Sequence, residues 1–347
     1  MGLIDVWGRL AAHAPQVVNY LAQTPPFATL LKAAVGLAPE RELPQFASLT
    51  FKEWFRTRGS VGGEESVILW PDTFTNHFHP GVGRAAVEVL ESAGFRVRVP
   101  PGPVCCGRPL YDFGMLGRAR RYLRRVLDVL AGDLQAGTPV VVLEPSCLAV
   151  FKDELGNLFP DDEDAQRLRD QSMLLSQLLV ERAHGWQPPR LGGRALVHGH
   201  CHQRALVGTE DDEKLLRQLG VEFEDPNAGC CGLAGSFGYE RGERYDVSMK
   251  AGERVLLPSV RAAPTDALVV ASGFSCRQQI GQATDRRALH LAQVVQMALR
   301  GGAGGDYPER DYAPAEARRR SAAPVLLAGA GLAVGAVLLR QLNTSRY

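Results

Sequence analysis

The triplet Cys-Cys-Gly occurs twice in this chain, at Cys105-Cys106-Gly107 and at Cys230-Cys231-Gly232. These turns contain four of the seven cysteines, and one further cysteine follows each turn at long range, Cys147 and Cys276. Because cysteine is a scarce residue, a repeat of the whole arrangement indicates an internal duplication. Thiolates held at fixed positions are the ligands that iron–sulfur clusters require. The sequence therefore predicts a duplicated cluster-binding unit.

Strands and helices are expected in the same order around both turns. In the first half, β-rich runs and amphipathic helical patterns alternate before and after the turn, at 67–70, 82–93, 95–99, 115–130 and 140–143. The second half repeats this order at 195–198, from Thr209 to Gly220, at 221–224, 239–257 and 268–270. Thr209, followed three residues later by Asp212, is typical of a helix N-terminal cap. The repeated order predicts two copies of an α/β unit.

We therefore expect an α/β protein with two pseudo-symmetric domains, at 63–160 and 193–300, joined by a helical linker at 161–192. Residues 1–62 are expected to form a helical extension, with helices at 4–21, 27–35 and 51–58 separated by prolines. A Gly- and Pro-rich linker at 301–320 precedes an apolar segment at 321–341.

The two halves differ by one cysteine. Aligning the strand at 67–70 with the strand at 195–198 places Thr73 opposite Cys201. The second half therefore has four candidate ligands, Cys201, Cys230, Cys231 and Cys276, and we expect these to bind metal. The first half has three, Cys105, Cys106 and Cys147, which predicts either a cluster with one open position or a degenerate copy that holds nothing.

Three histidines, His198, His200 and His202, flank Cys201. Together with the cysteines they suit a structural zinc site, because cysteine and histidine are its usual ligands. They also suit hydrogen bonding to cluster sulfur or a proton-shuttle role. In the first half, Asp72 and Thr73 are poor alternative iron ligands, and a Cys105–Cys106 disulfide is a further redox hypothesis.

Several other polar residues are close in sequence to the cysteines. Glu144, Arg108 and Arg277 are candidates to neutralise cluster charge or to face an anionic substrate, with structural ion pairs as the alternative. His77 and His79 are interpreted as surface-loop histidines. The sequence assigns a catalytic role to no residue.

These segments resemble the cysteine-rich CCG domain family, which includes heterodisulfide reductase chains and the iron–sulfur chain of glycolate oxidase. The resemblance rests on both Cys-Cys-Gly turns, on Glu144-Pro145-Ser146-Cys147 and on His198-Gly199-His200-Cys201-His202, and it covers about 66–299. The chain also resembles the C-terminal part of fused proteins that combine an FAD-linked oxidase, ferredoxin-type motifs and two CCG repeats. It departs from the fullest family motif because Cys147 and Cys276 each lack a neighbouring cysteine of a CxxC pair.

The resemblance implies a 4Fe–4S or a non-cubane iron–sulfur cluster. It also implies electron transfer from a partner flavoprotein that oxidises a 2-hydroxy acid, with quinone or a disulfide as acceptor. No ferredoxin-type cysteine run and no flavin-binding loop is present in the sequence. We therefore expect FAD and a ferredoxin-type subunit on partner chains. A catalytic thiol–disulfide reductase and a zinc-stabilised scaffold are the alternative functions.

Charge and hydropathy limit the partners and the location. The 39 basic and 38 acidic residues are balanced, so no nucleic-acid partner is expected. The segment 321–339 is uncharged, follows Arg318-Arg319-Arg320 and contains Gly331 and Gly335 in a GxxxG spacing. A helix of this length spans roughly 28 Å, close to the thickness of a bilayer core. We expect a membrane anchor with the body on the cytoplasmic side of the cell membrane, the alternative being a helix packed on the protein itself.

Deletion of residues 321–347 is predicted to move the protein from the membrane fraction to the soluble fraction without changing its iron content. The reason is that a Gly- and Pro-rich linker separates the segment from the cysteine motifs. Fractionation and iron analysis of both forms test this. Full-length protein that is soluble without detergent, or loss of iron on deletion, would contradict the anchor hypothesis.

Overall fold

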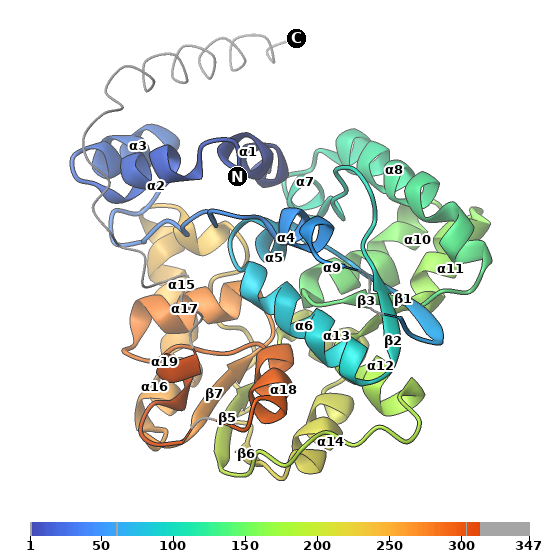
Figure 1. The fold of residues 1–347 in the computed structure, drawn as a ribbon. Helices are drawn as coiled ribbons and strands as arrows, with labels where there is room; N and C mark the ends of the chain where they lie inside the picture. The colour runs from blue at the N-terminus through green and yellow to red at the C-terminus, as the bar shows by residue number, and fades with distance from the viewer. Residues whose placement is uncertain (1, 60–61, 303, 313–347) are drawn as a thin grey trace.

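The computed structural model describes residues 2–59, 62–302 and 304–312. The described chain contains two parallel β-sheets, one from each half of the sequence (Figure 1). The first sheet has the strand order β2-β1-β3-β4, and the second has the order β6-β5-β7. The first-sheet strands are β1 (Glu65–Leu69), β2 (Phe95–Arg98), β3 (Val140–Val142) and β4 (Ser172–Leu174). Those of the second are β5 (Arg194–His198), β6 (Glu222–Glu224) and β7 (Leu268–Ala271). The expected α/β class with two repeats is confirmed.

The central strands are short, apolar and buried. Every residue of β3 and of β7 is buried, which is typical of parallel strands covered by helices on both faces. At the edge of the first sheet, β2 alternates between buried and exposed positions. The β-branched and apolar runs at 140–143 and 268–270 therefore form the strands that the sequence predicts.

The two sheets share one topology. In the first, β1 pairs in parallel with β2 and with β3, and β3 pairs with β4. In the second, β5 pairs with β6 and β7, and a bridge between Val270 and Leu289 takes the place of the fourth strand. The helical linker expected at 161–192 therefore contains a strand, β4, whose three residues are too few to show a strand period.

Helices connect the strands of both repeats. Those of the first repeat are α5 (Thr73–His77), α6 (Pro80–Ser92), α7 (Arg108–Asp112), α8 (Leu116–Gln135), α9 (Pro145–Ala149), the π-helix η1 (Val150–Glu154), α10 (Leu155–Leu158), α11 (Glu163–Gln171) and α12 (Leu175–Arg182). Those of the second are α13 (Cys201–Leu206), α14 (Glu210–Gln218), the 3-10 helix η2 (Phe237–Tyr239), α15 (Glu243–Glu253), α16 (Leu256–Ala262), α17 (Phe274–Ala283), α18 (Leu291–Leu299) and α19 (Pro308–Tyr312).

Two details of the second repeat differ from the prediction. The helix expected at 239–257 is divided between η2, α15 and α16. Thr209 occupies the N-cap of α14 but makes no side-chain capping bond. Asp212 does not complete a cap either, because its carboxylate accepts hydrogen bonds from Ser176 Oγ at 2.5 Å and Gln203 Nε2 at 2.7 Å. Tertiary contacts with α12 and α13 therefore override the local capping pattern.

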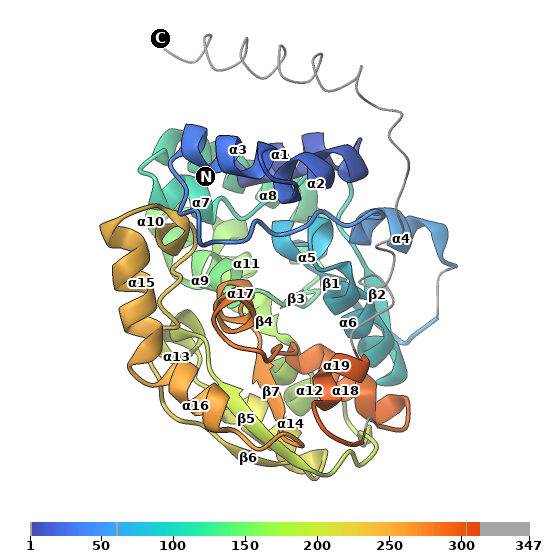
Figure 2. The ribbon, with the colours of Figure 1, turned by 90° about the vertical axis from the view of Figure 1, so that its left-hand side faces the viewer.

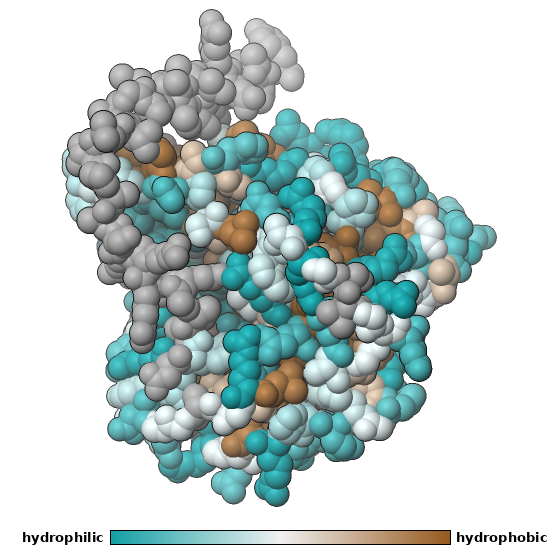
Figure 3. Space-filling view, viewed as in Figure 1, coloured by the Kyte–Doolittle hydropathy of each residue, from teal (hydrophilic) through white to brown (hydrophobic). Residues whose placement is uncertain are grey.

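The N-terminal extension is helical, as predicted. It consists of α1 (Ile4–Ala11), α2 (Pro15–Gln23), α3 (Phe27–Val35) and α4 (Phe51–Thr57), and Pro15 starts a new helix where one at 4–21 was expected. Helices α1 to α3 lie across one end of the molecule (Figure 2), and α1 is next to α7 (Figure 1). Six large apolar side chains of these helices are exposed: Leu10, Tyr20, Phe27, Leu30, Leu31 and Val35. Figure 3 shows patches of hydrophobic surface at this end of the molecule.

None of the helices in the described part of the chain is long and apolar enough to cross a membrane. The apolar segment predicted to be an anchor, 321–341, lies outside the described residues.

The two repeats share their largest apolar core, which contains residues of both sheets, such as Val67, Val141, Ala195 and Val270. The packing between them is reciprocal. Helix α6 of the first repeat packs on α18 of the second, and α14 of the second packs on α12 of the first. Each repeat therefore supplies part of the other's core, and neither is expected to fold independently.

A buried histidine joins the repeats at this boundary. His290 is 3% exposed. Its Nε2 donates to Leu143 O at 3.0 Å, and its Nδ1 accepts from Ala292 N at 3.0 Å. These two bonds require the neutral ring. Burial and the neighbouring Arg277 lower the pKa of His290 to about 3.

The neutral state of His290 predicts a pH dependence of stability. An unfolded histidine has a pKa of about 6.5, so the contribution is fully present above that pH. It is lost as pH falls from about 6.5 towards 3, at up to about 1.4 kcal/mol per pH unit. His290→Asn should therefore reduce the slope of unfolding free energy against pH in this window, as measured by denaturant unfolding. His184→Asn, at an exposed histidine, is the control, and an equal loss of slope there would contradict the assignment.

Candidate functional site

The four cysteines of the second repeat come from three segments that end at the same edge of the sheet. Cys201 begins α13 directly after β5, Cys230 and Cys231 lie in the turn after β6, and Cys276 lies in the first turn of α17 after β7. Since the carboxyl ends of parallel strands meet at one edge, these turns converge. The sulfur atoms form a series of hydrogen-bonded neighbours in the order Cys201, Cys230, Cys231, Cys276.

Interactions between neighbouring thiols of this series lower the pKa of some and raise the pKa of others. Hydrogen bonds from Cys201 and Cys231 hold the pKa of Cys230 far below its ordinary value. The hydrogen bond from Cys231 likewise lowers the pKa of Cys276. The hydrogen bond with Cys230 and burial raise the pKa of Cys201. Two of the four sulfurs, those of Cys230 and Cys276, are therefore favoured as thiolates, which is the form that binds metal.

Backbone N–H groups donate to the sulfurs in both Cys-Cys-Gly turns. Gly232 N donates to Cys230 Sγ at 3.3 Å, and Gly107 N donates to Cys105 Sγ at 3.5 Å. Gly232 has a positive φ of 92°, and a Cβ there would lie 2.1 Å from Ser248 O. The glycine after each cysteine pair therefore permits a turn that directs N–H groups at sulfur, an arrangement that tunes iron–sulfur clusters.

The first repeat has the same arrangement with one substitution. Cys106 Sγ lies 2.9 Å from Cys147 Sγ, and Thr73 Oγ1 donates to Cys105 Sγ at 3.7 Å. Thr73 begins α5 as Cys201 begins α13, so the hydroxyl stands where the second repeat has a thiol. This is the position that the sequence alignment predicts for Thr73.

The cysteines differ in exposure. All seven are free, and Cys105 and Cys106 form no disulfide. Cys230 is exposed and Cys201 is partly exposed, whereas the other five are buried. The second-repeat group therefore reaches the surface at Cys230.

The histidines beside Cys201 contact the site in different ways. His198 is buried close to Cys276 and interacts with it electrostatically, but neither ring nitrogen of His198 has a hydrogen-bond partner among the described residues. His200 caps α13, with Nδ1 accepting from His202 N at 3.2 Å. Across the described ranges, no three side chains of Cys, His, Asp or Glu are arranged to hold a single metal ion. Neighbouring thiols instead suit a cluster in which they bind different irons.

The surface-loop interpretation of His77 and His79 is wrong. The His77 side chain is buried at 5% exposure, against Gly8 of α1. Burial lowers the pKa of His77 to about 4. His79 is half-buried, with its ring centroid 5.1 Å from that of Phe274 in the second repeat. These contacts could not be inferred from the local sequence, because distant segments supply them.

The two cysteine sites meet across the boundary between the repeats. Helix α9, which follows Glu144 and contains Cys147, packs on α13 of the second repeat. Phe74 of α5 stacks on Phe274 of α17 with ring centroids 4.2 Å apart. Glu144 Oε2 accepts from Phe274 N at 2.8 Å, while Oε1 accepts from Ser146 Oγ at 2.9 Å. The predicted candidate Glu144 therefore links the two repeats.

The two candidate arginines have structural partners. Arg108 forms ion pairs with Glu154 and, at 2.9 Å, with Asp112. Arg277 is 8% exposed and donates to two backbone carbonyls, Ala271 O at 3.2 Å and Ser272 O. Arg108 therefore has the structural ion pairs named as the alternative. Arg277 has no ion pair at salt-bridge distance among the described residues, and its charge interacts favourably with Glu144, Asp72 and Cys276.

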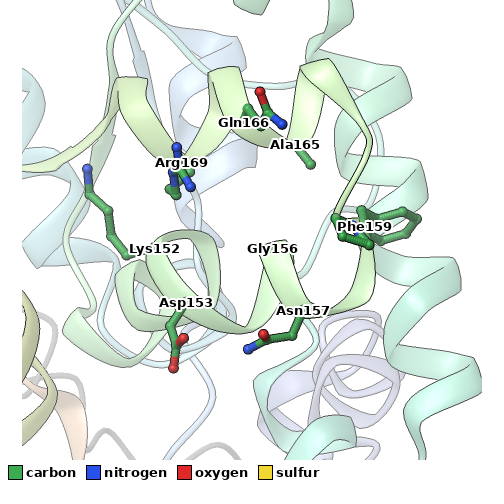
Figure 4. Close-up of a pocket in the computed structure, with 9 residues that line it drawn as sticks. Lys152, Asp153, Gly156, Asn157, Phe159, Ala165, Gln166 and Arg169 are labelled. Atoms are coloured by element: carbon green, nitrogen blue, oxygen red, sulfur yellow. The ribbon is translucent and has the colours of Figure 1, made fainter.

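A separate depression of about 340 Å³ lies on the first repeat, between η1, α10 and α11 (Figure 4). Its lining includes Lys152, Asp153, Asn157, Gln166 and Arg169. No cysteine or histidine among the described residues lines it, so it is not part of the cysteine sites.

Comparison with known proteins places these motifs in a family. The model of the cysteine-rich CCG domain matches residues 73–152 and 196–281, one match in each repeat. Lactate utilization protein A of Geobacillus kaustophilus is 31% identical over 66% of this chain and 98% of its own length. The chain belongs to the cysteine-rich CCG domain family.

Other relatives have different lengths. One chain of the anaerobic glycerol-3-phosphate dehydrogenase of Escherichia coli is 27% identical over 85% of this chain and 75% of its own length. D-2-hydroxyglutarate dehydrogenase of Pseudomonas putida is 26% identical over 82% of this chain but only 28% of its own length. The CCG region thus occurs both as most of a chain and as a minor part of a longer one.

Cys230 is predicted to be the most reactive thiol of the cluster-free protein, because it is exposed and its pKa is lowered. Under anaerobic native conditions, iodoacetamide should modify Cys230 at least about tenfold faster than buried Cys231. Mass spectrometry of peptides over time measures both rates, and Cys230→Ser is the control that should remove the fast phase. Equal rates at the two cysteines would contradict the geometry.

Proposed function

We propose that this chain is an iron–sulfur electron-transfer subunit of an oxidoreductase. The observation that carries the proposal is the group of four contacting cysteines, two of them favoured as thiolates and one accepting a backbone N–H bond. Cysteines that only fill a hydrophobic core do not need to contact one another or to accept backbone N–H bonds. An iron–sulfur cluster needs thiolate ligands and is tuned by hydrogen-bond donors to sulfur.

Cys201, Cys230, Cys231 and Cys276 would hold the cluster in the second repeat. When bound, the cluster supplies one-electron transfer. The chain's own residues orient the sulfurs and donate to them from the backbone, and burial of Cys231 and Cys276 excludes water from one side. A 4Fe–4S and a non-cubane cluster both agree with this donor set.

The first repeat offers a weaker site. Cys105, Cys106 and Cys147 would hold a second cluster with an open position at Thr73, or none. A hydroxyl in place of a thiol is a poor ligand for iron in a cluster. The second repeat is therefore the principal redox site of the proposal.

The names of the relatives support a partner dehydrogenase. One relative belongs to an anaerobic glycerol-3-phosphate dehydrogenase of more than one chain, and another is a D-2-hydroxyglutarate dehydrogenase in which the matching region is a minor part. We infer that a separate flavoprotein, of the type that oxidises 2-hydroxy acids, donates electrons to this chain, together with a ferredoxin-type subunit. Quinone or a disulfide would accept them.

A second candidate function is reduction of a disulfide substrate at the second-repeat cluster. The exposure of Cys230 and its lowered pKa favour this function, because disulfide chemistry needs an accessible thiolate.

Location on the cytoplasmic side of the membrane is also proposed, from the apolar segment at 321–339.

Visible absorption of anaerobically purified protein tests the proposal. We expect a brown chromophore that a reduced flavoprotein partner bleaches, and no oxidation of lactate or glycolate by the isolated chain. A colourless zinc-containing protein would overturn the iron–sulfur function. Hydroxy-acid oxidation without a partner would overturn the electron-carrier role, whereas turnover of a disulfide substrate would favour the second candidate.

Ligand substitutions should affect the two repeats unequally. Cys230→Ser is predicted to remove most of the iron, because a hydroxyl is a harder and much less acidic ligand than a thiol. Cys105→Ser should remove less, since its site already has Thr73 in place of a fourth thiol. Iron and sulfide analysis of both variants measures the difference. Equal loss from both would refute the asymmetry.

A further inference from the structure

A buried arginine from the N-terminal extension lies behind the second Cys-Cys-Gly turn. Arg41 is 2% exposed. It follows a short segment that docks on the second repeat, where Leu37 bridges to Glu240 and Ala38 N donates to Tyr239 O at 2.8 Å. The N-terminal extension therefore places the guanidinium of Arg41 within the second repeat, although the two are far apart in sequence.

Arg41 joins two elements of the second repeat. Its Nε donates to Gly238 O at 2.8 Å, and its Nη2 donates to Ser248 Oγ of α15 at 2.9 Å. The guanidinium also lies over the ring of Tyr245, 5.1 Å from the centroid. These contacts fix both its position and its orientation.

The same part of α15 supports the cysteine turn. A Cβ on Gly232 would lie 2.1 Å from Ser248 O, and a Cβ on Gly252 would lie 3.0 Å from Cys231 O. The backbone of the turn therefore rests directly on α15, on the helix that Arg41 binds through Ser248.

Arg41 forms no ion pair with a carboxylate of the described ranges at salt-bridge distance, although its chain neighbour Glu40 exerts a weak attraction. Arg286, which is similarly buried at 3% exposure, differs because its Nε pairs with Glu309 Oε1 at 2.6 Å. An unpaired buried charge is costly and normally has a counter-charge. The groups that interact favourably with the Arg41 charge are, in decreasing order, Tyr239, Tyr245, Cys231 and Glu40.

We propose that Arg41 acts on the second-repeat cluster through its charge: from its fixed position behind the Cys230-Cys231-Gly232 turn, it offsets the negative charge of the ligated thiolates. This inference rests on the proposed iron–sulfur function. A fixed buried cation stabilises the reduced, more negative state of a nearby cluster and so raises its reduction potential.

The test is an EPR-monitored redox titration of the anaerobically purified full chain and three variants. Arg41→Gln removes the charge and keeps an amide donor, Arg41→Lys keeps the charge, and Ser248→Ala removes one bracing bond without touching the charge. At the wild-type midpoint, Arg41→Gln should lower the ratio of reduced to oxidised cluster at least about tenfold, equivalent to about 59 mV for a one-electron couple. Arg41→Lys and Ser248→Ala should stay within about twofold of wild type.

An unchanged potential in Arg41→Gln would overturn the inference, as would an equal shift in all three variants. If Arg41→Gln binds no iron, Arg41→Lys decides: retained iron at the wild-type potential supports the charge role, and loss of iron in both overturns it. Wild-type protein without iron would overturn the proposed function and this inference with it, whereas a normal potential in Arg41→Gln overturns the inference alone.

Discussion

The carboxyl ends of parallel strands meet at one edge of each sheet, and this geometry underlies both cysteine sites. It brings Cys201, Cys230 and Cys276 together although the chain separates them widely. Sulfurs that would otherwise lie apart become neighbours, and backbone N–H donation at the glycine turns stabilises their negative charge. The geometry of the sheet therefore determines which sulfur atoms lie close together in each cysteine site.

Reciprocal packing of the repeats is the second organising feature. Helices α6 and α18, and helices α12 and α14, exchange contacts across the boundary, while Glu144 accepts a hydrogen bond from the backbone of Phe274. One core therefore serves both sheets. The contacts between the repeats therefore also fix the positions of the two cysteine sites relative to each other.

Buried ionisable groups at two places in this fold have different solutions. His290 is kept neutral, because both of its ring nitrogens have backbone partners. Arginine is kept charged, either paired as Arg286 is with Glu309 or, at Arg41, placed beside the cysteine turn without a carboxylate at salt-bridge distance. Burial of a charge without a counter-charge is unfavourable. On our proposal, the ligated thiolates of the second repeat supply the counter-charge that Glu309 supplies to Arg286.

The sequence predicted the α/β repeats, nearly every strand and the group of cysteines that converge. It could do so because local hydrophobic patterns and the positions of glycine show where each strand ends, and the cysteines follow these ends. The alignment of the two halves also placed Thr73 opposite Cys201. Only the tertiary structure showed four other features: the strand β4, the burial of His77 by α1, the link that Glu144 forms between the repeats, and the position of Arg41 behind Cys231. Each of these depends on residues far apart in sequence, and a local pattern carries no information on which distant segment will cover it.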